Sequence, residues 1–395
     1  MRHVSDHERR DRLARRHALA PSHRAPDPAS ATRAVVVLHA TEPATVHLSL
    51  QARVDGLRVA DVDRALYDDR SLVRQLAMRR TMFVFPRDLL PAAWGSAAAR
   101  TAAAERARLL KDVRAAGVAA DGEEWLRARQ DEVRAALAAE PGGLTSLEVR
   151  ARVPGLEVRI NGGTVWAAGR VLGQLGAAAE IVRGPNLLHW RQSRPRWRLA
   201  QEWLGGPPTP LDAPAGYAEL VRRWLHRFGP GTESDLVWWL GATKGAVRAA
   251  LAEVGAVEVG TDAAEAAYLL PDDLEPEPSV APWAALLPVL DPTVMGWKQR
   301  AFYLGEHQPV LFDRNGNAGT TAWWAGRVVG CWVQDEDGAV EVRLIEDVGA
   351  EGRAALGSEA ARLTDWLEGQ RVGTVYPSPA MRADPGDLAY AVVRA

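Results

Sequence analysis

One order of elements recurs along this chain, and it limits the folds available to the chain more than any other feature. The order is clearest near the middle, where Thr232 is a good N-cap and the apolar spacing that follows is helical. Three predicted helices are followed there by a predicted hairpin: 217–228, 233–240, 243–254 and 256–270. Three helices and a hairpin are the plan of a winged-helix module.

A second copy of this plan precedes the clearest one. Sequence with few helix breakers predicts two helices over 97–140, and further helices begin at Thr145 and cover 165–175. A hairpin is predicted over 178–190, with its turn at Gly184-Pro185. The Gly- and Pro-rich stretch 205–210 follows this copy, and its composition predicts a linker.

The first copy is the least regular of the three. Its predicted elements are two helices and a strand: 44–53, 61–78 and 79–86. The segment 44–53 fits either a helical or a strand period, and its length and alanine-rich context favour a helix. Two or three copies of one plan, without an exact sequence repeat, predict a tandem array of one supersecondary unit.

The last part of the chain has a different character. Between 280 and 395, short apolar runs are separated by Asn-Gly and Asp-Gly turns, which are strong hairpin signals, and one helix is predicted over 358–367. We therefore predict an α+β fold with three tandem winged-helix modules and a small, mostly β C-terminal domain. The predicted domains are 1–95, 96–205, 206–275 and 276–395.

Composition restricts the possible functions. The formal net charge is only -2, so a nucleic-acid partner has to be argued from local clusters of basic residues. The sequence lacks paired CxxC, HExxH, GxGxxG and GxxxxGK[ST] patterns, and its histidines are scattered. We therefore predict no metal site, no nucleotide cofactor and no other cofactor. Lysines occur only at 111, 244 and 298, which leaves few candidates for Schiff-base chemistry.

The single cysteine and the N-terminus suggest the compartment. Cys331 lies in an apolar run and is interpreted as a small buried hydrophobic residue, and one cysteine excludes a disulfide within the chain. The N-terminus is charged, without an apolar signal region, and no stretch is long enough to cross a bilayer. We expect a cytoplasmic protein that does not enter a membrane. A monomer is expected because the modules already form an array.

The densest basic cluster is predicted in the hairpin of the second copy. Its arginines are interleaved with His189, Trp190 and Trp197 and comprise Arg183, Arg191, Arg194, Arg196 and Arg198. Arginines and aromatic residues on a hairpin suit phosphate contacts and stacking on bases, so we predict a double-stranded DNA surface. The alternative is a solvated arginine-rich hairpin, and burial is the better interpretation for the two tryptophans.

A second candidate DNA contact lies in the third predicted copy. Lys244 and Arg248 fall near the start of its third helix, where a winged helix places the side chains that enter the groove. A tandem array can also use some of its copies only as scaffold, and this alternative stays open.

The most unusual local sequence is Leu38-His39-Ala40-Thr41-Glu42-Pro43-Ala44-Thr45. It places an imidazole, a hydroxyl and a carboxylate within four residues, between an apolar segment and a helix that begins with proline. A bend there could direct all three groups to one point. The alternative is a purely structural role, in which Thr41 or Glu42 caps the next helix and His39 is a hydrogen-bonded, partly buried residue. Residue types alone favour this alternative.

At this segment the chain resembles a known family, the bacterial winged-helix DNA glycosylases of the AlkZ, or azinomycin-resistance, type. The resemblance covers most of the chain, and its markers are His39–Thr45, Leu76–Met82, Leu290–Lys298 and Ala325–Trp332. It implies three winged-helix modules and a C-terminal β domain that form a concave surface around duplex DNA. Its markers contain Arg79, Arg80 and Lys298, which we add to the predicted DNA-binding residues.

The resemblance also implies a reaction, cleavage of the N-glycosidic bond of N7-alkylated purines and some crosslinks. The family's catalytic motif, usually Gln-x-Gln or Gln-x-Asp, falls on His39, Ala40 and Thr41, so both polar positions differ here. We predict His39 as general base, Thr41 as the residue that orients water, and Glu42 as an electrostatic stabiliser of positive charge.

Two functional hypotheses follow. The first is a monofunctional DNA glycosylase that acts on alkylated purines with water as the nucleophile. The alternative is a non-catalytic winged-helix DNA-binding protein, such as a transcriptional regulator or a lesion-binding scaffold. The pair His39 and Thr41 separates the two hypotheses.

Overall fold

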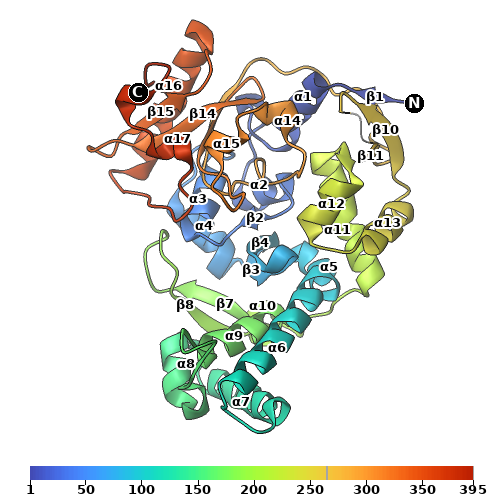
Figure 1. The fold of residues 1–395 in the computed structure, drawn as a ribbon, viewed down its shortest axis with the longest axis vertical. Coiled ribbons are helices and arrows are strands. Elements are labelled where there is room, and N and C mark those ends of the chain that lie inside the picture. The colour runs from blue at the N-terminus through green and yellow to red at the C-terminus, as the bar shows by residue number, and fades with distance from the viewer. Residues whose placement is uncertain (264–265, 395) are drawn as a thin grey trace. The chain divides into compact units, whose positions relative to one another are not determined.

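The computed structural model describes residues 1–263 and 266–394 (Figure 1). Its helices and small sheets confirm the predicted α+β class. The chain packs into two compact units, one built from Met1–Val62 with Val221–Ala395 and the other from Asp63–Leu220. The four predicted domain ranges stay a prediction. In the described residues, no helix combines the length and apolar character that a bilayer span requires.

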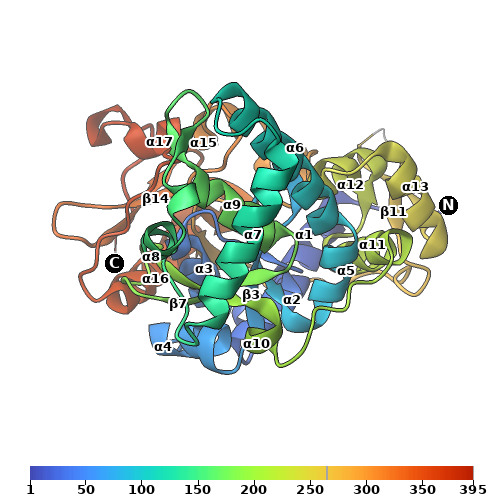
Figure 2. The ribbon, with the colours of Figure 1, turned by 90° about the horizontal axis from the view of Figure 1, so that it is seen from below.

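The unit Asp63–Leu220 begins with a π-helical turn and a hairpin and continues mostly as helices. Its main elements are β3 (Leu72–Leu76), β4 (Met82–Pro86), α5 (Leu90–Gly95), α6 (Ala97–Ala115), α7 (Gly122–Ala138), α8 (Ser146–Arg152), β5 (Arg159–Ile160), β6 (Val165–Trp166), α9 (Ala167–Ala177), β7 (Ile181–Asn186), β8 (Pro195–Leu199) and α10 (Ala200–Leu204). Helices α6 and α7 run side by side (Figure 2). Hairpins β3–β4, β5–β6 and β7–β8 are antiparallel.

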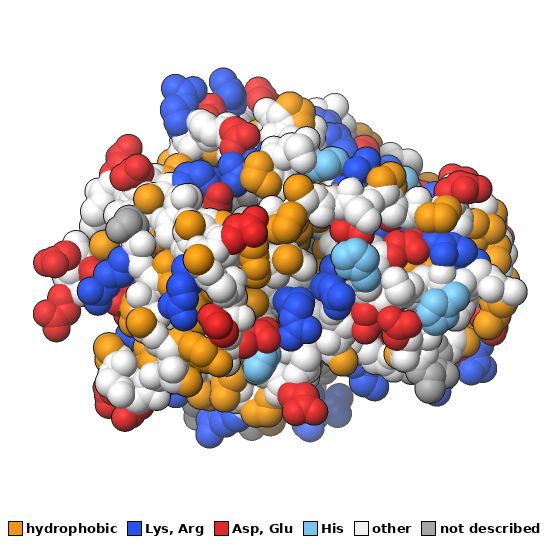
Figure 3. All heavy atoms as spheres, turned by 90° about the horizontal axis from the view of Figure 1, so that it is seen from above, with side chains coloured by type: hydrophobic (Ala, Val, Ile, Leu, Met, Phe, Trp, Pro, Cys, Tyr) orange, Lys and Arg blue, Asp and Glu red, His pale blue; other side chains and the backbone are white. Residues whose placement is uncertain are grey.

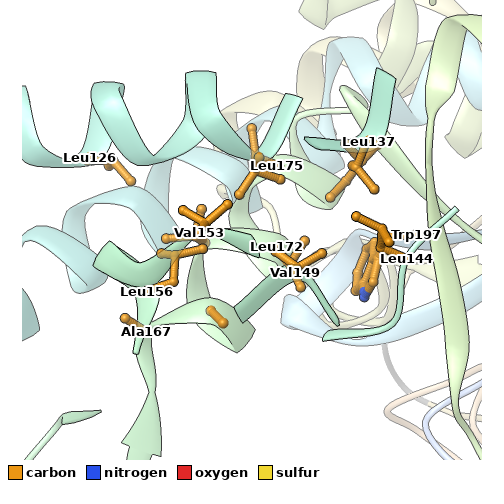
Figure 4. Packing of buried hydrophobic residues seen from close by; sticks show 14 of the residues in the cluster. Leu126, Leu137, Leu144, Val149, Val153, Leu156, Ala167, Leu172, Leu175 and Trp197 are labelled. Atoms are coloured by element: carbon orange, nitrogen blue, oxygen red, sulfur yellow. The ribbon is translucent and has the colours of Figure 1, made fainter. Parts of the chain in front are cut away.

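The core of this unit lies between α7, α8, α9 and the β7–β8 hairpin. Leu126 and Leu137 of α7 point toward Leu175 of α9, and Trp197 of β8 closes one end of the cluster (Figure 4). Helix α8 begins with a capping box, in which Thr145 and Glu148 satisfy each other's backbone N–H groups. The helix start predicted at Thr145 is confirmed.

The other unit contains the two ends of the chain. Its first elements are β1 (His3–Val4), α1 (Asp6–Arg16), α2 (Pro28–Ala34), β2 (Leu38–His39), α3 (Pro43–Gln51) and α4 (Val59–Asp63). Its middle elements are α11 (Ala213–Phe228), β9 (Gly231–Thr232), α12 (Glu233–Leu240), α13 (Lys244–Glu253), β10 (Val257–Thr261) and β11 (Ala267–Leu269). Strand β1 and the three strands of this middle part form a sheet in the order β1-β10-β11-β9, in which β1 pairs with β10 in parallel.

The C-terminal part of this unit is a four-stranded antiparallel sheet with helices. Its elements are β12 (Ala284–Leu287), α14 (Ala301–Leu304), α15 (Gln308–Leu311), β13 (Thr321–Trp324), β14 (Arg327–Gln334), β15 (Val340–Leu344), α16 (Gly349–Leu367) and α17 (Pro379–Arg382). The strands follow one another in chain order across the sheet, as hairpin-linked strands do. Tryptophans fill the core here: Trp297 packs against Phe228, and Trp323 stacks on Tyr303.

Three local predictions were wrong. The segment 61–78 is not one helix, because Leu72–Leu76 pairs with Met82–Pro86 and this pairing overrides the helical spacing of the leucines. The hairpin turn expected at Gly184-Pro185 lies further on, between β7 and β8. The helix expected over 358–367 begins earlier, so α16 covers Gly349–Leu367.

One sequence of elements occurs repeatedly in chain order. Around the third copy it runs α11, β9, α12, α13, β10 and β11, and the short strand β9 pairs with β11. Around the second copy it runs α7, α8, α9, β7 and β8, and Leu144 takes the place of β9 by bridging to Trp197. The first copy runs α2, β2, α3, α4, β3 and β4. The sequence alone did not predict the short strand after the first helix.

Candidate functional site

The segment His39–Glu42, called here the motif segment, connects β2 to α3. Proline at the first position of α3 has the fixed φ that a helix start requires, and Glu42 before it is extended, with φ -98° and ψ 126°. The three polar residues have different surroundings: His39 is only 4% exposed, Thr41 is exposed, and Glu42 is half-buried. The bend therefore does not present all three side chains equally to solvent.

Glu42 binds a loop near the end of the chain instead of capping α3. Its side chain makes no hydrogen bond to the first turn of the helix, which removes the Glu42 cap as an explanation of the motif. Oε1 accepts a hydrogen bond from Thr374 Oγ1 at 2.9 Å and another from the Val375 backbone N–H at 2.7 Å. Burial raises the pKa of the Glu42 carboxyl, and the two hydrogen bonds oppose that rise.

A buried polar network fixes the far end of α3. The guanidinium of Arg53 donates to both carboxylate oxygens of Asp291, at 2.8 and 2.7 Å. Its three other N–H groups donate to the Ser49 and His17 carbonyls and to Thr293 Oγ1. All five donors of the guanidinium are therefore used, which offsets the cost of burying the charge.

The same network sets the state of a buried histidine. His17 Nε2 lies 3.1 Å from the Arg227 carbonyl oxygen, which only accepts, so Nε2 carries the proton. Nδ1 then accepts from Thr293 Oγ1 at 2.8 Å. Burial, and after it the charge of Arg53, lowers the pKa of His17 well below its ordinary value. The imidazole is therefore neutral and structural.

A cavity of about 210 Å³ adjoins the motif segment. Glu42 and the first turns of α3 form one side of it, and the C-terminal sheet with residues 371–374 forms the other. The first turn of α3 is held against this sheet because Thr45 Oγ1 donates to the Val289 carbonyl at 3.1 Å. Glu42, which the sequence analysis predicts to stabilise positive charge, thus forms part of the cavity wall.

Most arginines of the β7–β8 hairpin pack along its strands. Arg183 lies over Trp197, with 4.9 Å from Cζ to the ring centroid, and Arg198 lies over Trp203 at 5.3 Å. Burial, together with the charge of Arg74, lowers the pKa of Arg183 to about 10. Arg196 pairs with a carboxylate, Glu148, at 3.6 Å. These three arginines therefore have structural contacts of their own.

The turn between β7 and β8 carries the other two arginines. Arg194 is exposed, and Arg191 Nε donates to His189 Nδ1 at 3.1 Å. Trp190 and Trp197 are 6% and 5% exposed, so the interpretation of both tryptophans as buried is confirmed. Arg191 and Arg194 are the arginines of this hairpin that lie outside its strands.

The other predicted DNA-binding residues lie on turns and helix starts. Arg79 and Arg80 occupy a turn at positive φ between β3 and β4, and Arg80 pairs with Glu105. Lys244 is exposed at the first position of α13, whereas Arg248 pairs with Glu233 at 2.7 Å. Lys298 is exposed, and its backbone N–H donates to the buried Asp235 at 2.8 Å.

Charge on the molecular surface is mixed. On the face shown in Figure 3, Lys and Arg side chains lie among Asp and Glu side chains and form no continuous basic field. This agrees with the net charge of -2 and leaves individual basic residues to provide contacts with an anionic partner. In residues 1–263 and 266–394, no group of three or more His, Cys, Asp or Glu side chains has the arrangement of a metal site.

Comparison with known proteins identifies the family of the chain. The model of the family described as DNA glycosylase AlkZ-like matches residues 32–366, which include the motif segment and the buried network. The chain belongs to the AlkZ-like DNA glycosylase family. Membership assigns it, at the level of the family, to DNA glycosylases of DNA repair, with DNA as the partner.

A solved structure shares the fold of this AlkZ-like chain. The Streptomyces sahachiroi DNA glycosylase AlkZ superimposes with a TM-score of 0.73 and 20% sequence identity. The match covers 93% of this chain and 97% of that chain, so it extends over both compact units. None of the curated proteins compared with the chain matches it.

Sequence reasoning missed the residues that fix α3 in this AlkZ-like protein. It gave no role to Arg53, and it used Asp291 only as part of a family marker. A signal was present, because Asp291 stands inside the apolar run Val289-Leu290-Asp291-Pro292, where a carboxylate needs a buried partner. The identity of that partner could not be found, since Arg53 lies 238 residues away.

Proposed function

We propose that this AlkZ-like protein is a monofunctional glycosylase that removes N7-alkylated purines or crosslinks from double-stranded DNA. An N7-alkylated purine is cationic and leaves readily, so the protein mainly has to orient water and stabilise an oxocarbenium-like sugar. The observation that carries the proposal is the half-buried Glu42 carboxylate, which is fixed by two hydrogen bonds at the start of an anchored helix.

The proposed step needs no cofactor. Water attacks C1′ of the nucleoside, and His39 takes its proton. The electron pair of the glycosidic bond stays with the purine and neutralises its positive charge. Thr41 orients the water, and Glu42 stabilises positive charge on the sugar. The products are the free base and an abasic site.

We further propose that the three repeated units are winged-helix modules that contact the duplex. The order helix, short strand, two helices and hairpin supports this interpretation for each unit. Arg191 and Arg194 lie in the turn of a hairpin, where a wing meets the DNA backbone. Lys244 stands at a helix N-terminus, where the dipole disfavours a cation, so a phosphate contact explains it better than helix stability does.

The test is excision from a duplex that contains 7-methylguanine, followed by alkali cleavage at abasic sites. The variants Glu42→Gln and His39→Asn should each lower the single-turnover rate by roughly 100-fold or more. Glu351→Gln, at an exposed carboxylate of α16 outside the cavity wall, is the matched control and should leave the rate unchanged. Full excision by both motif variants would overturn the proposed roles.

One observation favours a second candidate, a non-catalytic DNA-binding protein. His39 is 4% exposed, and neither polar position of the motif carries the family's usual residue. On this hypothesis the protein binds duplex DNA and releases no base from small or bulky N7 adducts. Tight binding to these duplexes without alkali-labile sites would select it over the glycosylase.

A further inference from the structure

The cavity beside Glu42 is mostly apolar. It is lined by α3, the segment after β12, β14, residues 371–374 and α17, and the apolar side chains include Ala44, Leu48, Val289, Trp332, Val372 and Met381. An engineered cavity of about 150 Å³ already holds benzene. At about 210 Å³, this cavity has room for a larger planar ring system.

The uncharged polar side chains of the cavity wall are hydrogen-bonded to other groups of the protein. Thr320 Oγ1 donates to the Trp332 carbonyl and accepts from its N–H. The Gln334 amide donates to the Gly338 and Gln370 carbonyls and accepts from the Val372 N–H. These groups therefore offer little to a ligand.

The charged groups of the wall differ in what they offer. The Arg371 guanidinium donates to the Asp335 and Glu336 carbonyls. The hydrogen bonds from Thr374 and Val375 both end on Oε1 of Glu42. Among the described residues, none donates to its other oxygen, Oε2. An apolar cavity with one available carboxylate oxygen suits a flat ring that carries positive charge.

We propose that this cavity binds the N7-alkylated purine itself and that Glu42 selects cationic over neutral purines. The proposal rests on the proposed glycosylase function, because it names the site that takes the lesion base. A half-buried carboxylate is screened less by water than an exposed one, so its attraction for a cation is stronger. A neutral purine fills the same space and leaves the carboxylate without a counter-charge, which is the basis of selection.

Binding of free nucleosides to the full-length protein tests this without DNA. The probes are 7-methylguanosine, studied at about pH 6 where it is a cation, and guanosine, which has the same ring system and no charge. Equilibrium dialysis should show roughly tenfold tighter binding of 7-methylguanosine, equivalent to ~1.4 kcal/mol. Glu42→Gln should reduce the ratio to within about twofold and leave guanosine binding unchanged.

Two further variants complete the experiment. Val372→Phe adds volume to a half-buried loop position in the wall and should weaken binding of both nucleosides, with an unchanged melting temperature as evidence of folding. Glu351→Gln, at an exposed carboxylate of α16 outside the cavity wall, should behave like the wild type. Equal affinities for the two nucleosides, or a preference that survives Glu42→Gln, would overturn the proposal.

The outcomes separate this inference from the proposed function. Selective nucleoside binding that depends on Glu42, without base excision from damaged duplexes, would support the cavity and refute the glycosylase. Base excision without any nucleoside preference would support the glycosylase and refute the cavity as the lesion site.

Discussion

Asp291 and Arg53 form a buried ion pair in which Arg53 Nη2 lies 2.7 Å from Asp291 Oδ1 and both side chains are 0% exposed. Asp291 also accepts hydrogen bonds from Ser49 Oγ and from the Thr293 backbone N–H. Arg53 lies two residues beyond the last residue of α3, the helix that begins at the motif segment, and Asp291 follows β12. The placement of the motif segment therefore depends on a residue from the C-terminal part of the chain.

The first prediction concerns the stability of this pair. Asp291→Ala leaves a buried guanidinium without its counter-charge and should lower the free energy of unfolding by about 3–5 kcal/mol. Replacing both partners, as Arg53→Met with Asp291→Leu, should cost less than the single change because no buried charge remains. Urea denaturation, monitored by circular dichroism, measures the free energy of unfolding of the single and the double variant.

An exposed ion pair provides the control for that prediction. Arg248 and Glu233 pair at 2.7 Å on the surface, and the Arg248 side chain is 66% exposed. Arg248→Ala should lower the free energy of unfolding far less than Asp291→Ala does, because water screens the exposed pair. If Asp291→Ala and Arg248→Ala lowered the free energy of unfolding equally, the buried pair would stabilise the fold no more than an exposed pair does.

Features governed by neighbours in the sequence could be predicted. Thr145, Thr232 and Thr243 each accept a hydrogen bond from a backbone N–H of the helix that they begin, and the predicted helix starts lie at or next to all three. A cap needs only residues one turn away, so its signal is local. The helix that begins at Pro43 could be predicted for the same reason.

Features governed by distant partners could not be predicted. Leu72–Leu76 has helical spacing, and only its pairing with Met82–Pro86 makes it a strand. The parallel pairing of β1 with β10 joins segments that no local pattern connects. At the candidate site the residue types of the motif segment were visible, but the bonds from Thr374 and Val375 to Glu42 were not.

The second prediction is a pH dependence that arises from His17. Because the pKa of buried His17 lies well below that of a histidine in the unfolded chain, only the unfolded chain binds a proton just below pH 6.5. Stability from this residue is therefore fully present above about pH 6.5 and falls on acidification, by about 1.4 kcal/mol per pH unit, until the folded-state pKa is reached.

Unfolding free energies measured from pH 7.5 to pH 5 test this behaviour. His17→Gln should flatten the slope, whatever it does to stability at neutral pH. His7→Gln, at a side chain that is 73% exposed, should leave the slope as in the wild type. A slope that is the same in the His17 variant would mean that other groups produce the acid sensitivity.

The third prediction concerns Cys331. The structure confirms that this residue is buried. Burial raises the pKa of its thiol to about 12, so almost no thiolate forms at neutral pH. The folded protein should therefore react with iodoacetamide only on the timescale of unfolding, whereas urea should expose one reactive thiol. A cysteine placed at the exposed Ser22 should react at once under native conditions.

The fourth prediction tests the proposed DNA surface. Arg191→Ala with Arg194→Ala removes two cations from the turn of the β7–β8 hairpin. If each contacts a phosphate, duplex affinity should fall, and the slope of log K against log salt should become shallower by about 1.8, because each phosphate contact contributes about 0.9. Fluorescence anisotropy between 50 and 200 mM salt measures both quantities.

The control for this prediction has to remove the same charge from elsewhere in the same compact unit. Arg106→Ala with Arg152→Ala does so, since both arginines are exposed and each pairs with a glutamate. This control should keep the wild-type salt slope, because an arginine neutralised by its own carboxylate releases no counterion from DNA. If the two double variants lose the same affinity and slope, the effect comes from net charge, and the hairpin turn is not the contact surface.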